Sequence, residues 1–259
     1  MTLYHIDAFT ENKFSGNPAV VIPLEHWMDE DLMQKIAMEN NQPETVFFVP
    51  NKDQYEIRWF TPTVEVDLCG HATLASAYVL FTILGHPTDE IEFFSHRSGI
   101  LKVRKNDTGL MTLNFPTDVF HEVPMLDGMM EAFGHQPKEA FKGKTDYMLV
   151  FDNEDQIRNM KPDMRKVAAI QCRGVIVTAK GNDVDFVSRF FGPQSGGDED
   201  PVTGSAHTTL TPYWSKVLGK NDHVALQVSP RGGKLILKNL GERIEISGYA
   251  TLYMTGNLC

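Results

Sequence analysis

Two short segments of the chain place a glycine beside polar or reactive side chains at the start of an apolar, helix-like run. These segments are Cys69–Ala72 and Thr203–Ala206. Where a loop enters a helix, free backbone N–H groups and the helix dipole favour a bound anion, and glycine lets the anion come close. We therefore predict that Gly70, Gly204 and Ser205 bind a small carboxylate. The alternative is that these residues are only helix caps and turn residues.

Glu44 is the first candidate for acid–base chemistry. It follows the end of a helix-like segment and comes just before the apolar, strand-like run Val46–Val49. A carboxylate at the mouth of such a strand can be partly removed from water, an environment that suits a general acid or base. The alternative is an ordinary solvated glutamate at a strand edge.

His71 and Asp200 complete the set of predicted catalytic residues with Glu44. His71 begins the first helix, where it can exchange a proton with a bound ligand, although a histidine at a helix start is often structural. Asp200 lies before the second helix, where the dipole alone favours acids. Its place beside Pro201 favours a role in orienting His71 or in accepting a substrate amine or hydroxyl group.

Cys69 offers a competing chemistry, because a helix start can activate a thiolate. The matching segment in the second half of the chain has Thr203 in place of a cysteine, so a proton transfer between two thiols is not available. A small buried cysteine is the favoured interpretation. The sequence has no CxxC spacing, no phosphate-binding loop and no nucleotide-binding glycine motif, so we predict neither a metal nor a cofactor.

Composition narrows the class of protein. The 259 residues carry a formal net charge of −10, and 42% of them are hydrophobic. An acidic chain without a dense run of Lys and Arg argues against nucleic acid or an anionic membrane as a partner. The beginning of the chain lacks the pattern of a signal peptide, and the longest apolar stretch is too short to cross a bilayer. We expect a cytoplasmic globular protein.

The order of the predicted elements repeats in the two halves of the chain. Each half contains a hairpin, then an apolar helix and then several strands. The helices are predicted at Ala72–Leu84 and Ala206–Leu218, the second with Pro212 inside it, where it should kink or delay the helix. A further short helix is predicted near Met125–Phe133. We predict an α+β protein of two similar lobes, residues 1–117 and 118–259, with a ligand site in a cleft between them.

In combination, these motifs make the chain resemble the PhzF family of phenazine-biosynthesis isomerases and their relatives. The segments that carry the resemblance span nearly the whole chain: Asp7–Thr10, Phe14–Ala19, Pro43–Thr45, Leu68–Thr73, Glu199–His207 and Ser229–Gly233. The resemblance implies a diaminopimelate-epimerase-like fold, in which each lobe is a curved mixed sheet wrapped around a central helix. It also implies a homodimer that acts without a cofactor on a small-molecule carboxylate.

The resemblance implies a role for each candidate. Glu44 would move the proton as general acid and base, while His71 and Asp200 would bind polar groups of the substrate. Ser205, with the amides of Gly70 and Gly204, would hold the carboxylate, and Asn17 would contribute to substrate binding.

The chain departs from the phenazine enzyme in the pair Gln42-Pro43 before Glu44, and in Cys69. Cys69 is typical of the broader relatives and resembles one of the two catalytic cysteines of the epimerases. We therefore predict a cofactor-independent isomerase acting on a small cyclic or unsaturated amino or hydroxy acid. The alternatives are a racemase, epimerase or dehydratase that uses Cys69, and a non-catalytic carboxylate-binding protein.

Overall fold

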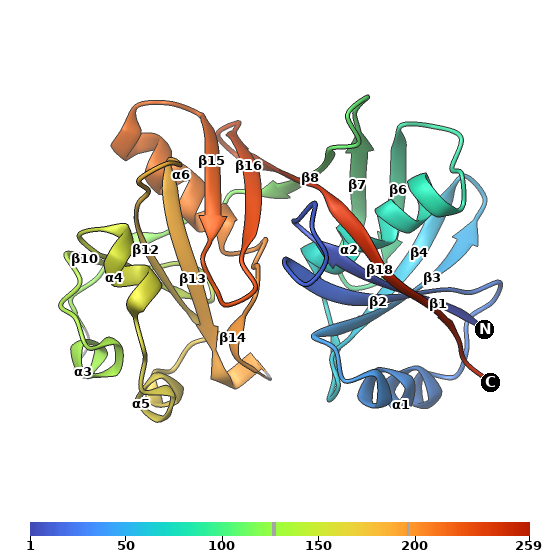
Figure 1. Ribbon diagram of the computed structural model, residues 1–259, viewed down its shortest axis with the longest axis horizontal. Coiled ribbons are helices and arrows are strands. Elements are labelled where there is room, and N and C mark those ends of the chain that lie inside the picture. Colours follow the sequence, from blue (N-terminus) through green and yellow to red (C-terminus); the bar gives the residue numbers. More distant parts are fainter. Residues whose placement is uncertain (126–127, 196) are drawn as a thin grey trace. The chain divides into compact units, whose positions relative to one another are not determined.

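The computed structural model describes residues 1–125, 128–195 and 197–259 (Figure 1). The chain forms two compact units: unit 1 contains residues Met1–Asn114 and Ser247–Cys259, and unit 2 contains residues Phe115–Ile246. No helix in the described part of the chain is both long and apolar enough to span a membrane.

Unit 1 is a mixed sheet with two helices. Its strands follow the order β18-β1-β2-β3-β4-β6-β7-β8, in which the β2/β3 and β4/β6 pairs are parallel and the other neighbours are antiparallel. The short β5 pairs with the end of β4. The elements are β1 Thr2–Ala8, β2 Asn17–Pro23, α1 Glu30–Asn40, β3 Glu44–Asn51, β4 Gln54–Phe60, β5 Glu65–Val66, α2 Gly70–Tyr78, the π-helical turn η1 Val79–Ile83, β6 Glu90–Ser95, β7 Gly99–Lys105, β8 Met111–Pro116 and β18 Ala250–Asn257.

Unit 2 repeats this series of pairings. Its strands follow the order β10-β11-β12-β13-β15-β16, which corresponds to β1-β2-β3-β4-β6-β7 of unit 1. In both series the second and fourth pairs of neighbours are parallel, here β11/β12 and β13/β15, and β9 pairs with β10. The internal duplication expected from the sequence is therefore present in the fold. The elements are β9 His121–Glu122, α3 Met129–Phe133, β10 Glu139–Lys142, β11 Tyr147–Val150, α4 Glu154–Asn159, α5 Met164–Ala169, β12 Val175–Lys180, β13 Phe186–Gly192, the 3-10 turn η2 Pro193–Ser195, β14 Gly197–Asp200, α6 His207–Leu218, β15 Asp222–Gln227, β16 Gly233–Asn239 and β17 Arg243–Gly248.

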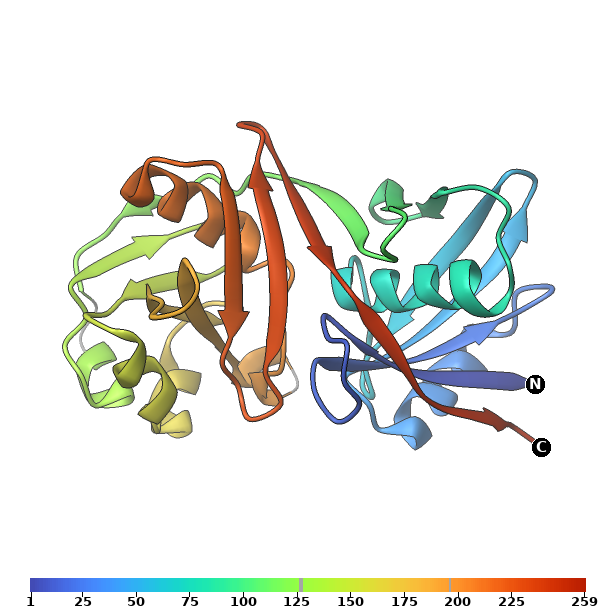
Figure 2. The same ribbon diagram turned by 45° about the horizontal axis from the view of Figure 1, so that its top comes forward.

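Helix α2 is the central helix of unit 1. Residues 71–77 of α2 are all buried, which accounts for a helix that is apolar or small on nearly every face. It packs against β1, β2, β3 and β18, and the teal helix in Figure 2 is α2 continued by η1. The enclosed helix predicted from the sequence is confirmed, but its final turns are π-helical rather than α-helical.

Helix α6 is the corresponding helix of unit 2 and runs through Pro212 without a delayed start. Proline has no N–H group, so the carbonyl of Thr208 receives no helical hydrogen bond from position 212. That carbonyl accepts a hydrogen bond from the backbone N–H of Asp118 instead, at 3.2 Å. The interruption in the helix therefore joins α6 to the segment that begins unit 2.

The end of the chain is where the structure differs most from the sequence prediction. Residues 247–259 belong to unit 1, although the prediction placed them in the second lobe. The reason is that β18 pairs along the whole length of β1, from Thr2 with Asn257 to Ala8 with Ala250. Strands β10 and β18 and the short strands β5, β9 and β14 were not predicted. The short helix expected near Met125–Phe133 begins at Met129, and residues 126–127 of that prediction lie outside the described residues.

Candidate active site

Four of the residues singled out from the sequence meet in unit 1. His71 Nε2 lies 3.0 Å from Glu44 Oε2. On the other side of the ring, His71 Nδ1 lies 3.1 Å from Asn17 Nδ2 and 3.4 Å from Cys69 Sγ. Apart from their ion pair, neither Glu44 Oε2 nor His71 Nε2 has a hydrogen-bond partner of normal geometry among the described residues. Buried polar atoms in this state are uncommon, and a catalytic or ligand-binding role is one explanation for them.

The fold explains why these side chains meet. Asn17 begins β2 and Glu44 begins β3, and the parallel pairing of Ala19 with Glu44 brings the two strand starts together. His71 is the second residue of α2, which packs on both strands. Before Asn17, Gly16 has a φ of +70°, and a Cβ atom there would lie 2.2 Å from the carbonyl oxygen of Ala8. Only glycine fits this turn, which sets the direction in which Asn17 enters β2.

The electrostatics favour a proton on the imidazole nitrogen nearest Glu44. Asn17 Nδ2 can only donate, so in a neutral His71 the proton is on Nε2. Burial opposes protonation of His71, but the electrostatic interactions with Cys69 and Glu44 outweigh it, and the pKa of His71 is raised. Burial and the charge of Glu44 raise the pKa of the Cys69 thiol. Glu44 provides the negative charge beside Nε2, which favours a proton on that nitrogen.

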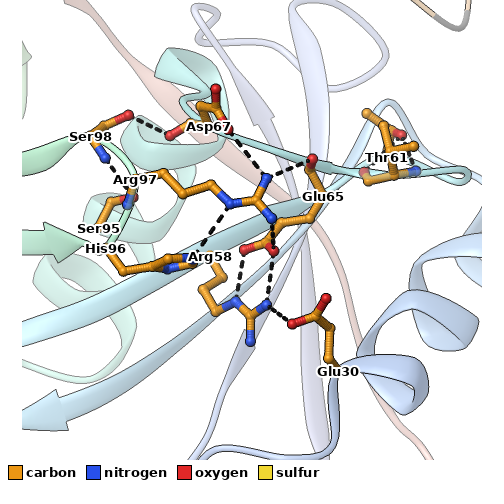
Figure 3. Close-up of polar contacts among 10 residues, drawn as sticks. Glu30, Arg58, Thr61, Glu65, Asp67, Ser95, His96, Arg97 and Ser98 are labelled. Atoms are coloured by element: carbon orange, nitrogen blue, oxygen red, sulfur yellow. Dashed lines mark hydrogen bonds and ion pairs between the residues drawn. The ribbon is translucent and has the colours of Figure 1, made fainter.

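An ion-pair network holds the loop that leads into α2 (Figure 3). Glu65 accepts hydrogen bonds at 2.7 and 2.8 Å from Arg58 and at 2.6 Å from Arg97. Arg97 also reaches Asp67 at 3.2 Å, and Ser98 donates to the Asp67 carbonyl at 2.5 Å. Burial opposes ionisation of Glu65, but the two arginines lower its pKa. The network fixes the segment two residues before Cys69, and so the position at which α2 begins.

The donor atoms of Glu44, Cys69 and His71 all lie within 4.8 Å of one another, close enough to surround a metal ion. Glu44 and Cys69, however, contact opposite nitrogens of the imidazole ring. A single ion could bind only one of these nitrogens, so the observed arrangement is that of a hydrogen-bonded cluster rather than a preformed metal site.

The second set of candidate residues lies in unit 2. Asp200 Oδ2 accepts a hydrogen bond from Thr203 Oγ1 at 2.5 Å. The buried side chain of Gln227 donates to the Asp200 carbonyl and accepts from the Thr203 N–H, both at 2.8 Å. Ser229 donates to the Pro201 carbonyl, also at 2.8 Å. Gln227 and Ser229 thus fix the turn that carries Asp200, and nothing in their local sequence indicated that Gln227 has this role.

Gly204 and Ser205 form the turn that enters α6. The backbone N–H groups of His207 and Thr208 donate to the carbonyls of Gly204 and Ser205, so the helical pattern begins at these residues. Gly204 is buried and Ser205 is exposed. The Ser205 hydroxyl accepts a hydrogen bond at 3.0 Å from Arg173, a residue that the sequence analysis did not single out.

His207 provides a pH-dependent contribution to the stability of unit 2. Its Nδ1–H donates to the Thr203 carbonyl at 2.9 Å, and burial lowers the pKa of His207 to about 4. An unfolded histidine titrates near 6.5, so the unfolded chain takes up a proton first and stability falls as the pH drops from about 6.5 towards 4. Between pH 7 and pH 5 we expect a loss of about 2 kcal/mol from this group.

Urea denaturation at both pH values would measure this loss, with His207→Gln as the comparison. The variant should lose about 2 kcal/mol less than the wild type over the same interval. Burial also lowers the pKa of His223, so part of the pH dependence should remain in the variant. Equal losses in the two proteins would contradict the assignment to His207.

The structure thus divides the predicted site residues between the two units. Unit 1 brings together Asn17, Glu44 and His71, with Gly70 beside them at the start of α2. Unit 2 brings together Asp200, Gly204 and Ser205. The cleft between the lobes and the action of Asp200 on His71 stay predictions.

The fold of the chain is of the PhzF and epimerase-like class. A crystal structure of a PhzF-family phenazine biosynthesis protein from Enterococcus faecalis superposes with a TM-score of 0.95 and 44% identity, covering 98% of this chain and 97% of that one. A hydroxyproline epimerase from Agrobacterium vitis shares the fold alone, with a TM-score of 0.61 and 11% identity, covering 99% of this chain and 91% of that one.

Sequence comparison gives the family. The model of the phenazine biosynthesis-like protein family matches residues 6–256. A protein named an uncharacterized isomerase from Pseudomonas aeruginosa is 47% identical over 258 residues, covering 100% of this chain and 98% of the relative. The human phenazine biosynthesis-like domain-containing protein is 37% identical over 288 residues, covering 100% of this chain and 99% of the relative. The chain belongs to the phenazine biosynthesis-like protein family.

Proposed function

We propose that this protein is an isomerase that moves a proton on a small cyclic or unsaturated amino or hydroxy carboxylic acid. The observation that carries the proposal is the buried pair of Glu44 Oε2 and His71 Nε2, 3.0 Å apart, in a chain whose bacterial relatives include proteins named isomerases. A carboxylate and an imidazole held at this distance are suited to general acid–base catalysis.

In the proposed reaction, the Glu44 carboxylate removes a proton from a substrate carbon and the bonding electrons delocalise into the adjacent unsaturated system. Glu44 then gives a proton to a different carbon, so that one C–H bond breaks and another forms with no net oxidation. Deuterium enters the product because the Glu44 carboxyl group can exchange its proton with D₂O before the proton returns. The Nε2 atom of His71 lies against the Glu44 carboxylate and holds it in position, and Asn17 holds the imidazole ring in orientation through Nδ1.

The carboxylate of the substrate is proposed to bind at the helix starts. The first backbone N–H groups of a helix have no partner within that helix, and the helix dipole favours an anion near them. Gly70 provides such a start at α2, and Gly204 with the exposed Ser205 provides one at α6. Asp200, held by Thr203, is proposed to accept a hydrogen bond from an amine or hydroxyl group of the same substrate.

Proton NMR in D₂O tests the proposal directly. The purified protein is incubated with a panel of small amino and hydroxy carboxylic acids, including unsaturated ring acids such as a dihydro-hydroxyanthranilate. Incorporation of deuterium at carbon, or appearance of an isomer, is the expected result for at least one acid. Binding of carboxylates without exchange of any C–H proton would instead favour a non-catalytic binding protein.

The second candidate is a racemase, epimerase or dehydratase in which Cys69 transfers the proton, favoured by the position of its Sγ atom 3.4 Å from His71. The raised pKa of the buried thiol argues against it, because the thiolate is the reactive form. For Cys69→Ala we expect exchange rates within about threefold of wild type, far less than the factor of about 10²–10⁴ that a general acid or base contributes.

The exchange rate of Cys69→Ala would be measured by the same D₂O experiment, with Cys172→Ala as the control for loss of a thiol elsewhere. A loss as large as that of a general base, confined to Cys69→Ala, would assign the proton transfer to the thiol and not to Glu44.

A further inference from the structure

Arg173 in unit 2 is fixed on two sides. Its Nε donates to Asp146 Oδ1 at 2.8 Å and its Nη2 donates to Asp146 Oδ2, which is the bidentate pairing that a guanidinium prefers. Its guanidinium carbon lies 5.1 Å from the centre of the Phe190 ring, in a cation–π contact. Asp146 and Phe190 are both buried, whereas 37% of the Arg173 side chain is exposed.

The backbone around this pair is fixed as well. Asp146 and Gly174 come directly before β11 and β12, which are parallel, so both lie at the same end of the sheet. The Arg173 N–H donates to the Thr145 carbonyl at 3.1 Å, and the Tyr147 N–H donates to the Gly174 carbonyl at the same distance. A Cβ atom at Gly174 would lie 2.2 Å from the Phe190 ring, so the close approach of this backbone requires glycine.

Asp118 links the loop that carries Asp146 to helix α6, which begins just after Ser205. Its side chain accepts hydrogen bonds from the Lys144 N–H at 3.2 Å and from Thr209 Oγ1 at 2.8 Å. Its own N–H donates to the Thr208 carbonyl of α6. The start of α6 therefore has a fixed position relative to Asp146 and Arg173.

The third contact of Arg173 is made with the candidate substrate-binding residue. Arg173 Nη1 donates to Ser205 Oγ at 3.0 Å. A serine hydroxyl has one proton and two lone pairs, so a donor that occupies one lone pair restricts the directions in which the proton can point. A cationic donor also makes that proton a better hydrogen-bond donor, because hydrogen bonds in a chain polarise one another.

We propose that Arg173 is a positioning residue that orients the Ser205 hydroxyl to donate to the carboxylate of the substrate, with Asp146 and Phe190 holding the guanidinium in place. The inference rests on the proposed function, because the proposed function places the substrate carboxylate at the start of α6. It adds that selection of an anionic substrate depends on Arg173.

The local charges support this role. Asp146, Asp118 and Asp200 all act electrostatically on Arg173, so an incoming carboxylate meets three acidic side chains in this part of unit 2. Burial disfavours the charged guanidinium, but its hydrogen bond and ion pair with Asp146 outweigh this and raise the pKa of Arg173. The permanent positive charge of Arg173 offsets part of this negative charge, so its removal should make the approach of an anion to Ser205 less favourable.

The test compares Arg173→Gln, Arg173→Lys and the matched control Arg158→Gln, which removes a partly exposed arginine paired with Glu154 on α4. Binding of anthranilate and of its neutral amide, anthranilamide, is measured by calorimetry, and KM and kcat are measured with any acid that shows exchange. A charge-assisted hydrogen bond contributes about 10- to 100-fold to affinity, so Arg173→Gln should weaken carboxylate binding or raise KM by that factor.

The expected pattern has three parts. Arg173→Gln loses its preference for anthranilate over anthranilamide, Arg173→Lys recovers part of it, and Arg158→Gln behaves as wild type. The kcat of Arg173→Gln stays within about threefold, since the proton-transfer group is unchanged. A purely structural role would instead reduce the affinity for acid and amide equally and would not be rescued by lysine, and that result would overturn the inference.

The outcome is separable from that of the proposed function. If wild-type protein binds anthranilate but exchanges no proton, the isomerase proposal fails while the binding comparison still tests Arg173. If exchange occurs and Arg173→Gln keeps a wild-type KM and wild-type discrimination, the inference about Arg173 fails while the isomerase proposal stands. If the wild type does not distinguish the acid from the amide, or binds neither, the inference also fails.

Discussion

Replacing Glu44 by glutamine should abolish most of the exchange of substrate protons with D₂O while leaving the protein folded. General acid–base groups contribute about 10²–10⁴-fold to rate, and we expect Glu44→Gln to lose a factor in this range. The amide has nearly the shape of the carboxylate, so the packing of β3 against β2 and α2 should persist. What the variant lacks is a group that can take up and return a proton 3.0 Å from His71.

The measurement is the rate of deuterium incorporation by NMR, normalised to folded protein, with Glu11→Gln as the control for removal of an exposed carboxylate. Glu44→Asp keeps the acid but shortens the side chain, so it should retain more activity than the amide. Because a misplacement of about 1 Å can cost about 10²-fold in rate, the exchange rate of Glu44→Asp should still be well below that of wild type. Near-full exchange by Glu44→Gln would remove Glu44 from the mechanism.

Replacing Phe186 by alanine should produce a large loss of stability in unit 2. The ring is fully buried and stacks on Trp214, with ring centres 5.6 Å apart and planes at 5°. It also contacts the rings of His207 and His223 at 6.1 and 6.0 Å. Truncation of a buried phenylalanine costs about 3–5 kcal/mol through lost burial and a residual cavity, and we expect Phe186→Ala to fall in this range.

Urea denaturation would give the free energy of unfolding, with two variants for comparison. Phe186→Leu fills more of the space and should cost less than Phe186→Ala. Phe14→Ala removes a ring that is 71% exposed in unit 1 and should change stability by less than about 1 kcal/mol. Because Phe186 packs on His207 at the start of α6, its loss should also weaken carboxylate binding by Ser205. A cost below 1 kcal/mol for Phe186→Ala would contradict this account of the core.

Local sequence patterns were sufficient for most elements and for the repeat. The hairpin predicted in the first half is formed by β3 and β4 and closes across Lys52 and Asp53, with Asn51 paired to Gln54. Helix α1 is capped by Asp29, which accepts a hydrogen bond from the Asp31 N–H, as expected for an aspartate at that position. These features depend on neighbouring residues, and short-range propensities act in the same way wherever the segment lies in the fold.

Strand β18 could not be predicted from local sequence patterns. Its residues are only partly buried or exposed, so it lacks the strong hydrophobic pattern of a central strand. What makes it a strand of unit 1 is its backbone pairing with β1, at the opposite end of the chain. Backbone N–H and C=O groups are nearly the same in every residue type, so the local sequence of a strand does not identify the strand with which it pairs.

The sequence by itself determined the candidate residues Glu44, His71, Asp200 and Ser205, because their types and their places at helix and strand starts are local properties. Only the tertiary structure decided which of them meet: Glu44 reaches His71 through the parallel pairing of β2 and β3 and the packing of α2 on both. Arg173 was missed for the same reason. Its contact with Ser205 joins residues 32 positions apart, and contacts of that range are set by how strands and helices pack rather than by neighbouring side chains.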